Sequence, residues 1–300
     1  MKIRNATLSS SYEPNIARLF SAAVLKELAT KGHSYLAASL LKEADLLQEY
    51  NPSTILRFFF DEAYDVLLRK YRNEYVYKNA IAKNILLGRH SLSKTFMLTE
   101  FRAGNCKADV VLLNGTSTVY EIKTAYDSME RLSTQIAAYR KVFDNINVIT
   151  SFSQLAKVED VIDDDIGIMV LTDSRNSIKI IRKPVSLKEK VQPLVIFDSL
   201  RKSEYEQITK EHFDVVLNVS NANMYRTCRE CFCSLTPIMA HDYMVTALKK
   251  RGSSRRLCDF IKLVPDSLKA ASLSCKFNDK QKAFFLEVLD TDIGTCLGVG

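Results

Sequence analysis

Apolar residues in the first third of the chain recur every three or four positions, which is the spacing of one face of an α-helix. Turn-forming residues at Lys31-Gly32 and Asn51-Pro52 interrupt this pattern, and Ser53 is a suitable N-cap for a third helix. We therefore predict helices over residues 14–90, the third running over residues 53–87 with little interruption. The apolar positions that carry the pattern are Ile16, Leu19, Phe20, Val24, Leu25, Leu36, Leu40, Leu41 and Leu46.

From about residue 94 the pattern changes to short runs rich in β-branched and aromatic residues, which is typical of strands. Turn residues separate these runs, and Asn114-Gly115 is a strong signal for a tight hairpin. A helical segment follows over residues 128–144, and helical spacing returns beyond Pro184. The order predicts helices, then a compact α/β unit, then helices. The predicted strands are residues 95–101, 108–113, 119–123, 147–151, 166–171 and 178–182, with one further candidate at 194–197.

The composition is that of an ordinary folded protein. Hydrophobic residues make up 47% and charged residues 26% of the 300 positions, which excludes a disordered regulator, a collagen-like chain and a coiled-coil rod. The 9 glycines and 6 prolines leave little material for long flexible linkers. We predict a helical N-terminal region over residues 1–70, a core over residues 71–185 and a mostly helical C-terminal region over residues 186–300.

Charge and cysteine content bear on partners and location. A net charge of +7 is compatible with a polyanionic partner without requiring one. The first residues lack the apolar run of a secretory signal, and no segment reaches the roughly 18 apolar residues of a membrane span. The 7 cysteines fit a reducing compartment, and the cluster Cys228, Cys231 and Cys233 lacks the second pair that a zinc site needs. The sequence predicts a cytoplasmic protein without a membrane partner.

Three charged residues in the second and third predicted strands indicate a chemical role. Side chains alternate along a strand, so Glu121 and Lys123 share one face. Asp109 opens the neighbouring strand and is expected to approach Glu121 across the sheet. Two carboxylates with open water positions suit a hard divalent cation such as Mg²⁺. A lysine beside such an ion suits the orientation of an attacking water or the stabilisation of charge on a phosphate.

The order of these residues resembles the PD-(D/E)XK nuclease superfamily. Asp109, a gap of 11 residues and Glu121-x-Lys123 match its central motif, although Ala108 stands where many members have proline. Downstream, Gln135 and Tyr139 are similar to the Gln-x-x-x-Tyr element of the RecB-like branch, and their spacing places them on one face of a helix.

The resemblance implies a restriction-endonuclease-like core, an α/β (α+β) fold in which a small mixed sheet is flanked by helices. It also implies metal-dependent hydrolysis of phosphodiester bonds, with Asp109, Glu121, Lys123, Gln135 and Tyr139 as the catalytic residues. The implied cofactor is Mg²⁺ or Mn²⁺, held by Asp109 and Glu121.

Glu74 is our preferred candidate for a third metal ligand. Many members of the superfamily carry a glutamate on the helix before the strands, and Glu74 and Lys78 share a helical stripe. Glu100, on the first predicted strand, is the competing candidate. Arg72, Lys78 and Lys83 surround the proposed helix and are our candidates for contacts with nucleic acid, although such a run is also typical of a solvated face.

More narrowly, the run over residues 121–135 resembles an uncharacterised bacterial family known by an sce-type locus name, and this likeness covers residues 70–185. Its members occur among mobile elements and phage-defence islands. We therefore predict a metal-dependent nuclease that acts on DNA, with a role in phage defence or mobile-element biology. The alternatives are an RNA nuclease and a non-catalytic nucleic-acid-binding or interaction protein. The helical flanks are candidates for a protein partner or for homo-oligomer formation.

Overall fold

The computed structural model describes residues 12–88, 94–173, 176–213, 220–251 and 255–298. The chain forms two compact units: unit 1 combines Met1–Gly88 with Ser254–Gly300, and unit 2 is Arg89–Ser253. Within the described ranges, every helix is too short or too polar to traverse a lipid bilayer.

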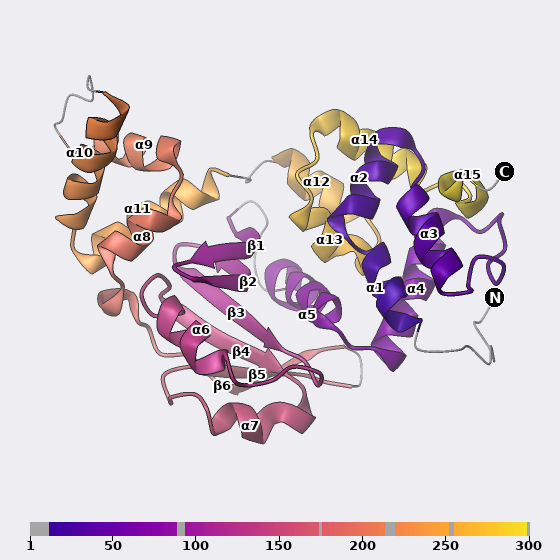
Figure 1. Ribbon diagram of the computed structural model, residues 1–300, viewed down its shortest axis with the longest axis horizontal. Helices are drawn as coiled ribbons and strands as arrows, with labels where there is room; N and C mark the ends of the chain where they lie inside the picture. Colours follow the sequence, from indigo (N-terminus) through magenta and orange to yellow (C-terminus); the bar gives the residue numbers. More distant parts are fainter. Residues whose placement is uncertain (1–11, 89–93, 174–175, 214–219, 252–254, 299–300) are drawn as a thin grey trace. The chain divides into compact units, whose positions relative to one another are not determined.

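Unit 2 is built on a six-stranded mixed sheet in which the strands follow one another in chain order (Figure 1). Strands β1 to β3 form an antiparallel meander, β3, β4 and β5 run parallel, and β6 returns antiparallel to β5. This arrangement confirms the predicted mixed sheet with flanking helices. The strands are β1 (Phe96–Ala103), β2 (Cys106–Leu113), β3 (Ser117–Lys123), β4 (Asn145–Thr150), β5 (Gly167–Leu171) and β6 (Ile178–Arg182).

Short connections account for the antiparallel pairs. Gly115 has φ 100° in the turn between β2 and β3, a backbone conformation that glycine adopts without strain, so the predicted hairpin at Asn114-Gly115 is confirmed. Parallel neighbours instead need a crossover. Helix α6 (Leu132–Tyr139) crosses from β3 to β4, and η2 (Phe152–Gln154) with α7 (Leu155–Glu159) leads from β4 to β5. On α6, Leu132, Ile136 and Tyr139 are buried in the core of unit 2.

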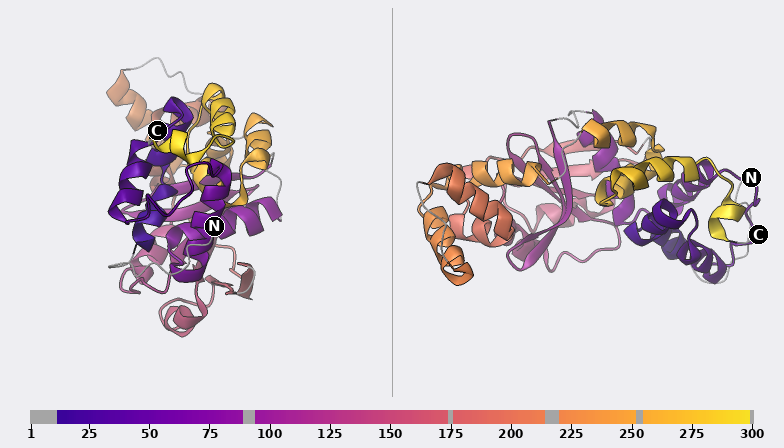
Figure 2. Two further views of the ribbon diagram at one scale, coloured as in Figure 1. Left: turned by 90° about the vertical axis from the view of Figure 1, so that its right-hand side faces the viewer. Right: turned by 90° about the horizontal axis from the view of Figure 1, so that it is seen from above.

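Helices after the sheet complete unit 2 and pack beside β1 and β2 (Figures 1 and 2). Residues 194–197 were predicted as a strand, but the structure places them in a helix. Four consecutive apolar residues are compatible with either element, and Pro193 favours the helix because the first helical turn tolerates a missing N–H. These elements are η3 (Lys188–Lys190), α8 (Pro193–Ser199), α9 (Lys202–His212), α10 (Asn221–Cys233) and α11 (Pro237–Lys249).

Unit 1 is helical and joins the two ends of the chain (Figures 1 and 2). Helix α14 packs against α2, and α15 packs against α3 and α4. Hydrogen bonds donated by the backbone N–H groups of Leu56, Ile293 and Gly294 join the two chain segments and add to this packing. Its elements are α1 (Glu13–Leu19), α2 (Ala22–Lys31), α3 (Tyr35–Glu43), α4 (Leu56–Lys70), α5 (Glu74–Ile81), η1 (Ala82–Leu87), α12 (Arg255–Leu263), η4 (Asp266–Leu268), α13 (Lys269–Ser274), α14 (Asp279–Val288) and α15 (Ile293–Leu297).

These units differ from the three predicted regions of residues 1–70, 71–185 and 186–300. Residues 186–253 pack on the sheet, whereas residues 254–300 pack on the N-terminal helices. The predicted continuous helix over residues 53–87 is also divided in the structure. Tyr71, with φ −147° and ψ 77°, ends α4, and Asn73 precedes α5 in an extended conformation.

A buried asparagine ties the two chain segments of unit 1 together. The Asn79 side chain, 2% exposed, donates to the carbonyl oxygen of Asp266 (2.8 Å) and accepts from the backbone N–H of Ala270 (3.0 Å). We expect Asn79→Ala to destabilise unit 1 by about 2 kcal/mol, because a buried backbone N–H and a half-buried carbonyl oxygen lose their partner. Hydrogen exchange of α5 and α13 measures this loss, and Gln48→Ala, which removes an exposed amide side chain of unit 1, is the control. Unchanged protection in Asn79→Ala would contradict this expectation.

Candidate active site

Four polar residues of unit 2 meet between the end of β3 and helix α6. Glu121 and Lys123 are two positions apart on β3, so their side chains leave the same face of the strand. Gln135 and Tyr139 are four positions apart on α6, so they share the face of the helix that is turned to the core. Local periodicity in a strand and in a helix therefore accounts for the meeting of all four side chains.

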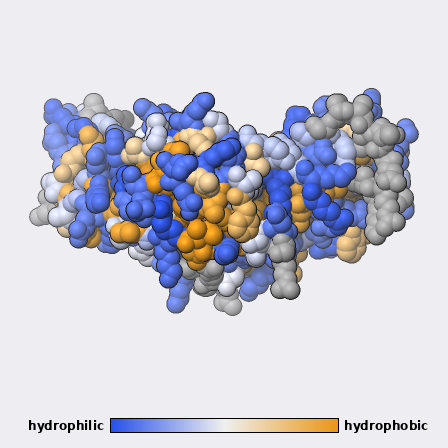
Figure 3. All heavy atoms as spheres, turned by 90° about the horizontal axis from the view of Figure 1, so that it is seen from below, coloured by the Kyte–Doolittle hydropathy of each residue, from blue (hydrophilic) through white to orange (hydrophobic). Residues whose placement is uncertain are grey.

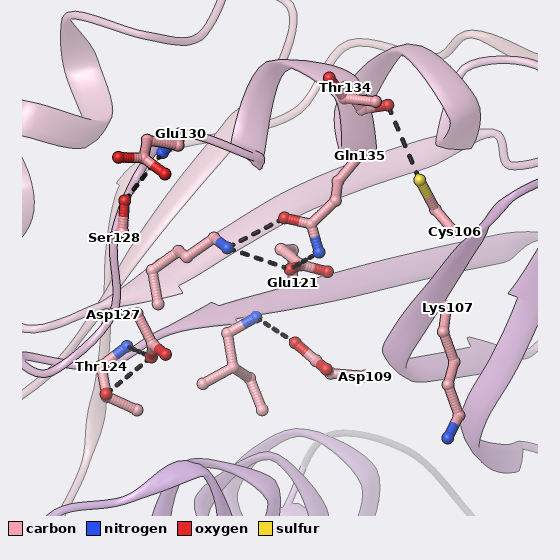
Figure 4. A network of polar contacts seen from close by, with 12 residues as sticks. Cys106, Lys107, Asp109, Glu121, Thr124, Asp127, Ser128, Glu130, Thr134 and Gln135 are labelled. Carbon is pink, nitrogen blue, oxygen red and sulfur yellow. Dashed lines mark hydrogen bonds and ion pairs between the residues drawn. The ribbon is translucent and has the colours of Figure 1, made fainter.

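The four side chains form one hydrogen-bonded network, part of which is drawn in Figure 4. Lys123 Nζ donates to Gln135 Oε1 (2.9 Å) and lies 3.5 Å from Glu121 Oε1. The Gln135 amide N–H donates to that same glutamate oxygen. The Tyr139 hydroxyl donates to Glu121 Oε2 (2.7 Å) and also lies 3.0 Å from the carbonyl oxygen of Lys107. Glu121 is thus held by three different donors.

Burial gives this network its electrostatic character. Glu121 is 2% exposed and Lys123 is 7% exposed, and charges so far from water are costly unless they are paired and hydrogen-bonded. Burial raises the pKa of Glu121, while the Tyr139 hydroxyl and the Lys123 ammonium act in the opposite direction. The pKa of Tyr139 is raised by its own burial and by the negative charges of Glu121 and Asp109.

Asp109 lies on β2 beside this network. The register pairs Val110 with Tyr120, so the next position on each strand sets Asp109 across from Glu121. Asp109 is half-buried, and its Oδ2 accepts a hydrogen bond from the backbone N–H of Ile122 (2.8 Å) (Figure 4). The structure therefore brings together all five predicted catalytic residues.

The residues predicted on the preceding helix belong to unit 1, whereas the five residues above belong to unit 2. Within unit 1 the Glu74 carboxylate pairs with Lys78 at 2.5 Å. Lys83 pairs with Asp266 at 2.5 Å, and Arg72 Nε donates to the carbonyl oxygen of Leu68 (3.0 Å). Each of the three predicted nucleic-acid contacts, Arg72, Lys78 and Lys83, therefore has a partner inside the protein.

Glu100, the competing carboxylate, lies on β1 within unit 2. Phe101 pairs with Ala108 and Thr99 pairs with Val110, so Glu100 occupies the position across from Asp109. Its φ is 58°, which is uncommon for a residue other than glycine. Its carboxylate pairs with Lys107 at 2.5 Å, on an exposed surface.

The backbone at Glu100 leads to a stability prediction. We expect Glu100→Gly to stabilise unit 2 by about 1 kcal/mol, because a side chain in the left-handed region costs about 1–2 kcal/mol and an exposed ion pair contributes less. Urea denaturation compares the stability of Glu100→Gly with that of Glu100→Ala, which removes the same ion pair and keeps the strained Cβ. Equal stability of the two variants would contradict the expectation.

The donor set fits a hard cation with few protein ligands. Within the described ranges, no three His, Cys, Asp or Glu side chains gather as a metal-binding group. Mg²⁺ nevertheless needs only one or two carboxylates, because water and substrate phosphate supply its other oxygens. A carboxylate has about four acceptor positions, and three hydrogen-bond or ion-pair partners approach Glu121. Asp109 and Glu121 are therefore the residues that would hold such an ion.

Sequence reasoning missed a second buried network, at the other end of β3. Ser117 Oγ lies 2.8 Å from His241 Nε2, and His241 Nδ1 lies 3.2 Å from Asp242 Oδ1. Ser117 and His241 are both 0% exposed, and burial lowers the pKa of His241. Such a serine is out of reach of any substrate, so we interpret the network as an anchor of α11 on β3. Ser117 and His241 lie 124 positions apart in the sequence, and no local motif links them.

The fold and the site define an α/β protein whose mixed sheet carries a buried carboxylate–lysine–amide network beside a second carboxylate. A family model described as bacteriophage P4 protein cII matches residues 68–272. This match covers more than half of the chain, and the chain therefore belongs to the bacteriophage P4 protein cII family. The matched range includes every residue of the network.

One relative and one solved structure are similar to parts of the chain. Protein cII of Enterobacteria phage P4 is 24% identical over 165 residues, which are 53% of this chain and 61% of that protein. The chain therefore spans less than two thirds of this relative. The SPO1766 protein of unknown function from Silicibacter pomeroyi has 13% identity and a TM-score of 0.31, over 47% of this chain and 93% of that one. A structural likeness this weak carries no argument.

Proposed function

We propose that the chain is a metal-dependent nuclease of the PD-(D/E)XK type that hydrolyses phosphodiester bonds in DNA. The observation that carries the proposal is the buried contact of Lys123 with Glu121 and Gln135, next to Asp109 on the neighbouring strand. Perturbed, buried charges with specific partners are more frequent at functional sites than elsewhere. The element order also supports it, because a three-stranded meander, a helix and a parallel strand make up the core of that superfamily.

Each residue has a distinct part in this proposal. A Mg²⁺ or Mn²⁺ ion held by Asp109 and Glu121 would polarise the phosphate and acidify an attacking water. Lys123 stabilises the negative charge that develops on the phosphate. Gln135 fixes the position of the Lys123 ammonium by accepting its hydrogen bond, and Tyr139 orients Glu121 by donating to its other oxygen.

A non-catalytic nucleic-acid-binding protein is the second candidate. Two observations favour it: several partners already engage Glu121, and the described residues hold no group of three metal-binding side chains. An RNA substrate is a further alternative, because these contacts do not distinguish the two nucleic acids. A cytoplasmic location and a role in mobile-element biology or phage defence belong to the same proposal, which the phage origin of the relative supports. The helical flanks are the proposed site of a protein partner or of self-association.

The deciding experiment is a cleavage assay on the full chain. Supercoiled plasmid, linear duplex, single-stranded DNA and single-stranded RNA are incubated with Mg²⁺, Mn²⁺ or EDTA. Metal-dependent loss of a DNA substrate supports the nuclease, and the substrates that are cut show whether a free end is required. Cleavage of RNA alone favours the RNA nuclease. Retained binding without cleavage of any substrate favours the binding protein.

A further inference from the structure

Two segments, residues 124–127 and residues 151–154, lie side by side beyond the carboxyl ends of the parallel strands β3 and β4. Lys123 pairs with Thr150 in the register, and the Thr150 hydroxyl donates to the carbonyl oxygen of Lys123 (2.7 Å). Further along, the Gln154 side chain donates to the carbonyl oxygen of Ala125 (3.2 Å). Ligands of parallel sheets commonly bind outside the carboxyl ends of the strands. These two segments therefore border the candidate active site.

The first of these segments is held in one conformation by its own side chains. Asp127 Oδ2 accepts from the backbone N–H of Thr124 (2.8 Å) and from its hydroxyl (2.7 Å), and Figure 4 shows this turn next to the network. The backbone N–H of Tyr126 donates to the Thr124 hydroxyl (3.2 Å). A side chain on such a turn loses little further backbone freedom when it binds a ligand.

Each segment presents a large aromatic side chain to solvent. Tyr126 is 61% exposed and Phe152 is 50% exposed, whereas most aromatic side chains of unit 2 are buried. The two rings are identified by these exposed fractions. Figure 3 shows one face of the molecule, on which hydrophobic residues gather in places among hydrophilic ones. The chain neighbours of Phe152 are small and polar: Ser151 and Ser153 share a hydrogen bond (2.8 Å) in an exposed position. Next to Tyr126, Asp127 is a charged neighbour. Aromatic rings in polar surroundings suit a ligand with a flat apolar face and a charged backbone.

We propose that Tyr126 and Phe152 are a stacking platform for the unpaired bases of single-stranded nucleic acid. This inference rests on the proposed function, because the platform would hold the strand whose phosphate reaches Lys123 three positions before Tyr126. Stacking accepts every base, so the platform predicts little sequence preference. It predicts instead that the protein prefers single strands, frayed ends or gaps over continuous duplex.

Binding without catalysis tests the platform. The full chain is titrated in EDTA against a fluorescein-labelled single-stranded oligothymidine, and fluorescence anisotropy gives Kd. Tyr126→Ala and Phe152→Ala are each expected to raise Kd by about 5- to 150-fold, the range for loss of one stacked base. Tyr126→Phe keeps the ring and is expected to stay within about twofold of the natural protein. Phe58→Ala, which removes a ring that is 57% exposed on α4 of unit 1, is the matched control.

The outcomes separate this inference from the proposed function. Unchanged Kd in both alanine variants, or no binding of the oligonucleotide by the natural protein, overturns the platform. If the protein cleaves duplex DNA and either of these two binding results is found, the proposed nuclease activity is retained and only the platform is rejected. Weakened binding in both variants without cleavage of any substrate supports the platform and removes the nuclease. If the variants bind normally but lose self-association in sedimentation, the aromatic rings contact protein and the platform is wrong.

Discussion

Asp109→Asn is expected to lower metal-dependent cleavage of DNA by about 10²- to 10⁴-fold, the range for loss of one charged catalytic group. The substitution is chosen because the asparagine oxygen still accepts the hydrogen bond that Asp109 Oδ2 receives from the backbone N–H of Ile122. The side chain keeps its size and its contact with β3, and only the negative charge is lost. The loss of cleavage would then report on chemistry and not on folding.

Two measurements make the result of Asp109→Asn decisive. Circular dichroism during heating is expected to give an unchanged Tm, and cleavage is measured over a range of Mn²⁺ concentrations to detect weakened metal binding. Asp160→Asn, which changes an exposed aspartate of unit 2, is the control and is expected to cut at the natural rate. Full activity in Asp109→Asn would refute the assignment of Asp109 as a metal ligand.

Much of the sheet and of the candidate site could be predicted because the relevant signals are local. Asn114-Gly115 sets a hairpin through backbone conformation alone, and it fixes the register that brings Asp109 opposite Glu121. The period of two along a strand and the four-residue spacing along α6 place Lys123 and Gln135 on facing surfaces. The contact between them at 2.9 Å follows from these two periodicities.

The division of the chain into units could not be predicted because it depends on contacts between distant segments. Asn79 binds the backbone near Asp266, and Ser117 binds His241, yet neither pair carries a sequence signal. Amphipathic helices are recognisable one by one, but any of them can pack on any apolar surface. The end of helix α4 at Tyr71 could not be predicted for a related reason. The apolar spacing continues across the break between α4 and α5, so the sequence suggests one helix.

The roles proposed for Glu74 and Lys78, on the helix before the sheet, stay predictions. Glu74 and Lys78 share a helical stripe, as predicted, and the structure pairs them with each other. Two residues spaced i, i+4 on a helix can form an ion pair with each other. The same spacing also suits a metal ligand (Glu74) next to a phosphate contact (Lys78), so spacing alone does not distinguish the two roles. The sequence offers Glu100 as the competing ligand, but it gives no signal of the positive φ of this residue, which becomes visible only in the backbone.

Lys123→Met is expected to destabilise unit 2 by about 3–5 kcal/mol near neutral pH, because it leaves the charge of Glu121 buried without its cationic partner. Methionine fills nearly the same volume, so the loss is electrostatic rather than a cavity effect. Hydrogen exchange of the β3 amides measures the free energy of opening in unit 2 alone. Lys157→Met, on the exposed side of α7, is the control and is expected to leave this free energy unchanged.

The pH dependence of the loss identifies its cause. Burial holds the pKa of Glu121 above its ordinary value of 4.5, and the Lys123 charge opposes that rise. Removing Lys123 therefore raises the pKa of Glu121 further. The folded state then binds the proton more tightly than the unfolded state, so stability falls as pH rises through the folded pKa and returns as pH falls towards 4.5. We expect the penalty of Lys123→Met to shrink in acid and to be largely removed when Glu121→Gln is added. A penalty that is independent of pH would instead assign the loss to packing, and Lys123 would then have no electrostatic part in holding Glu121.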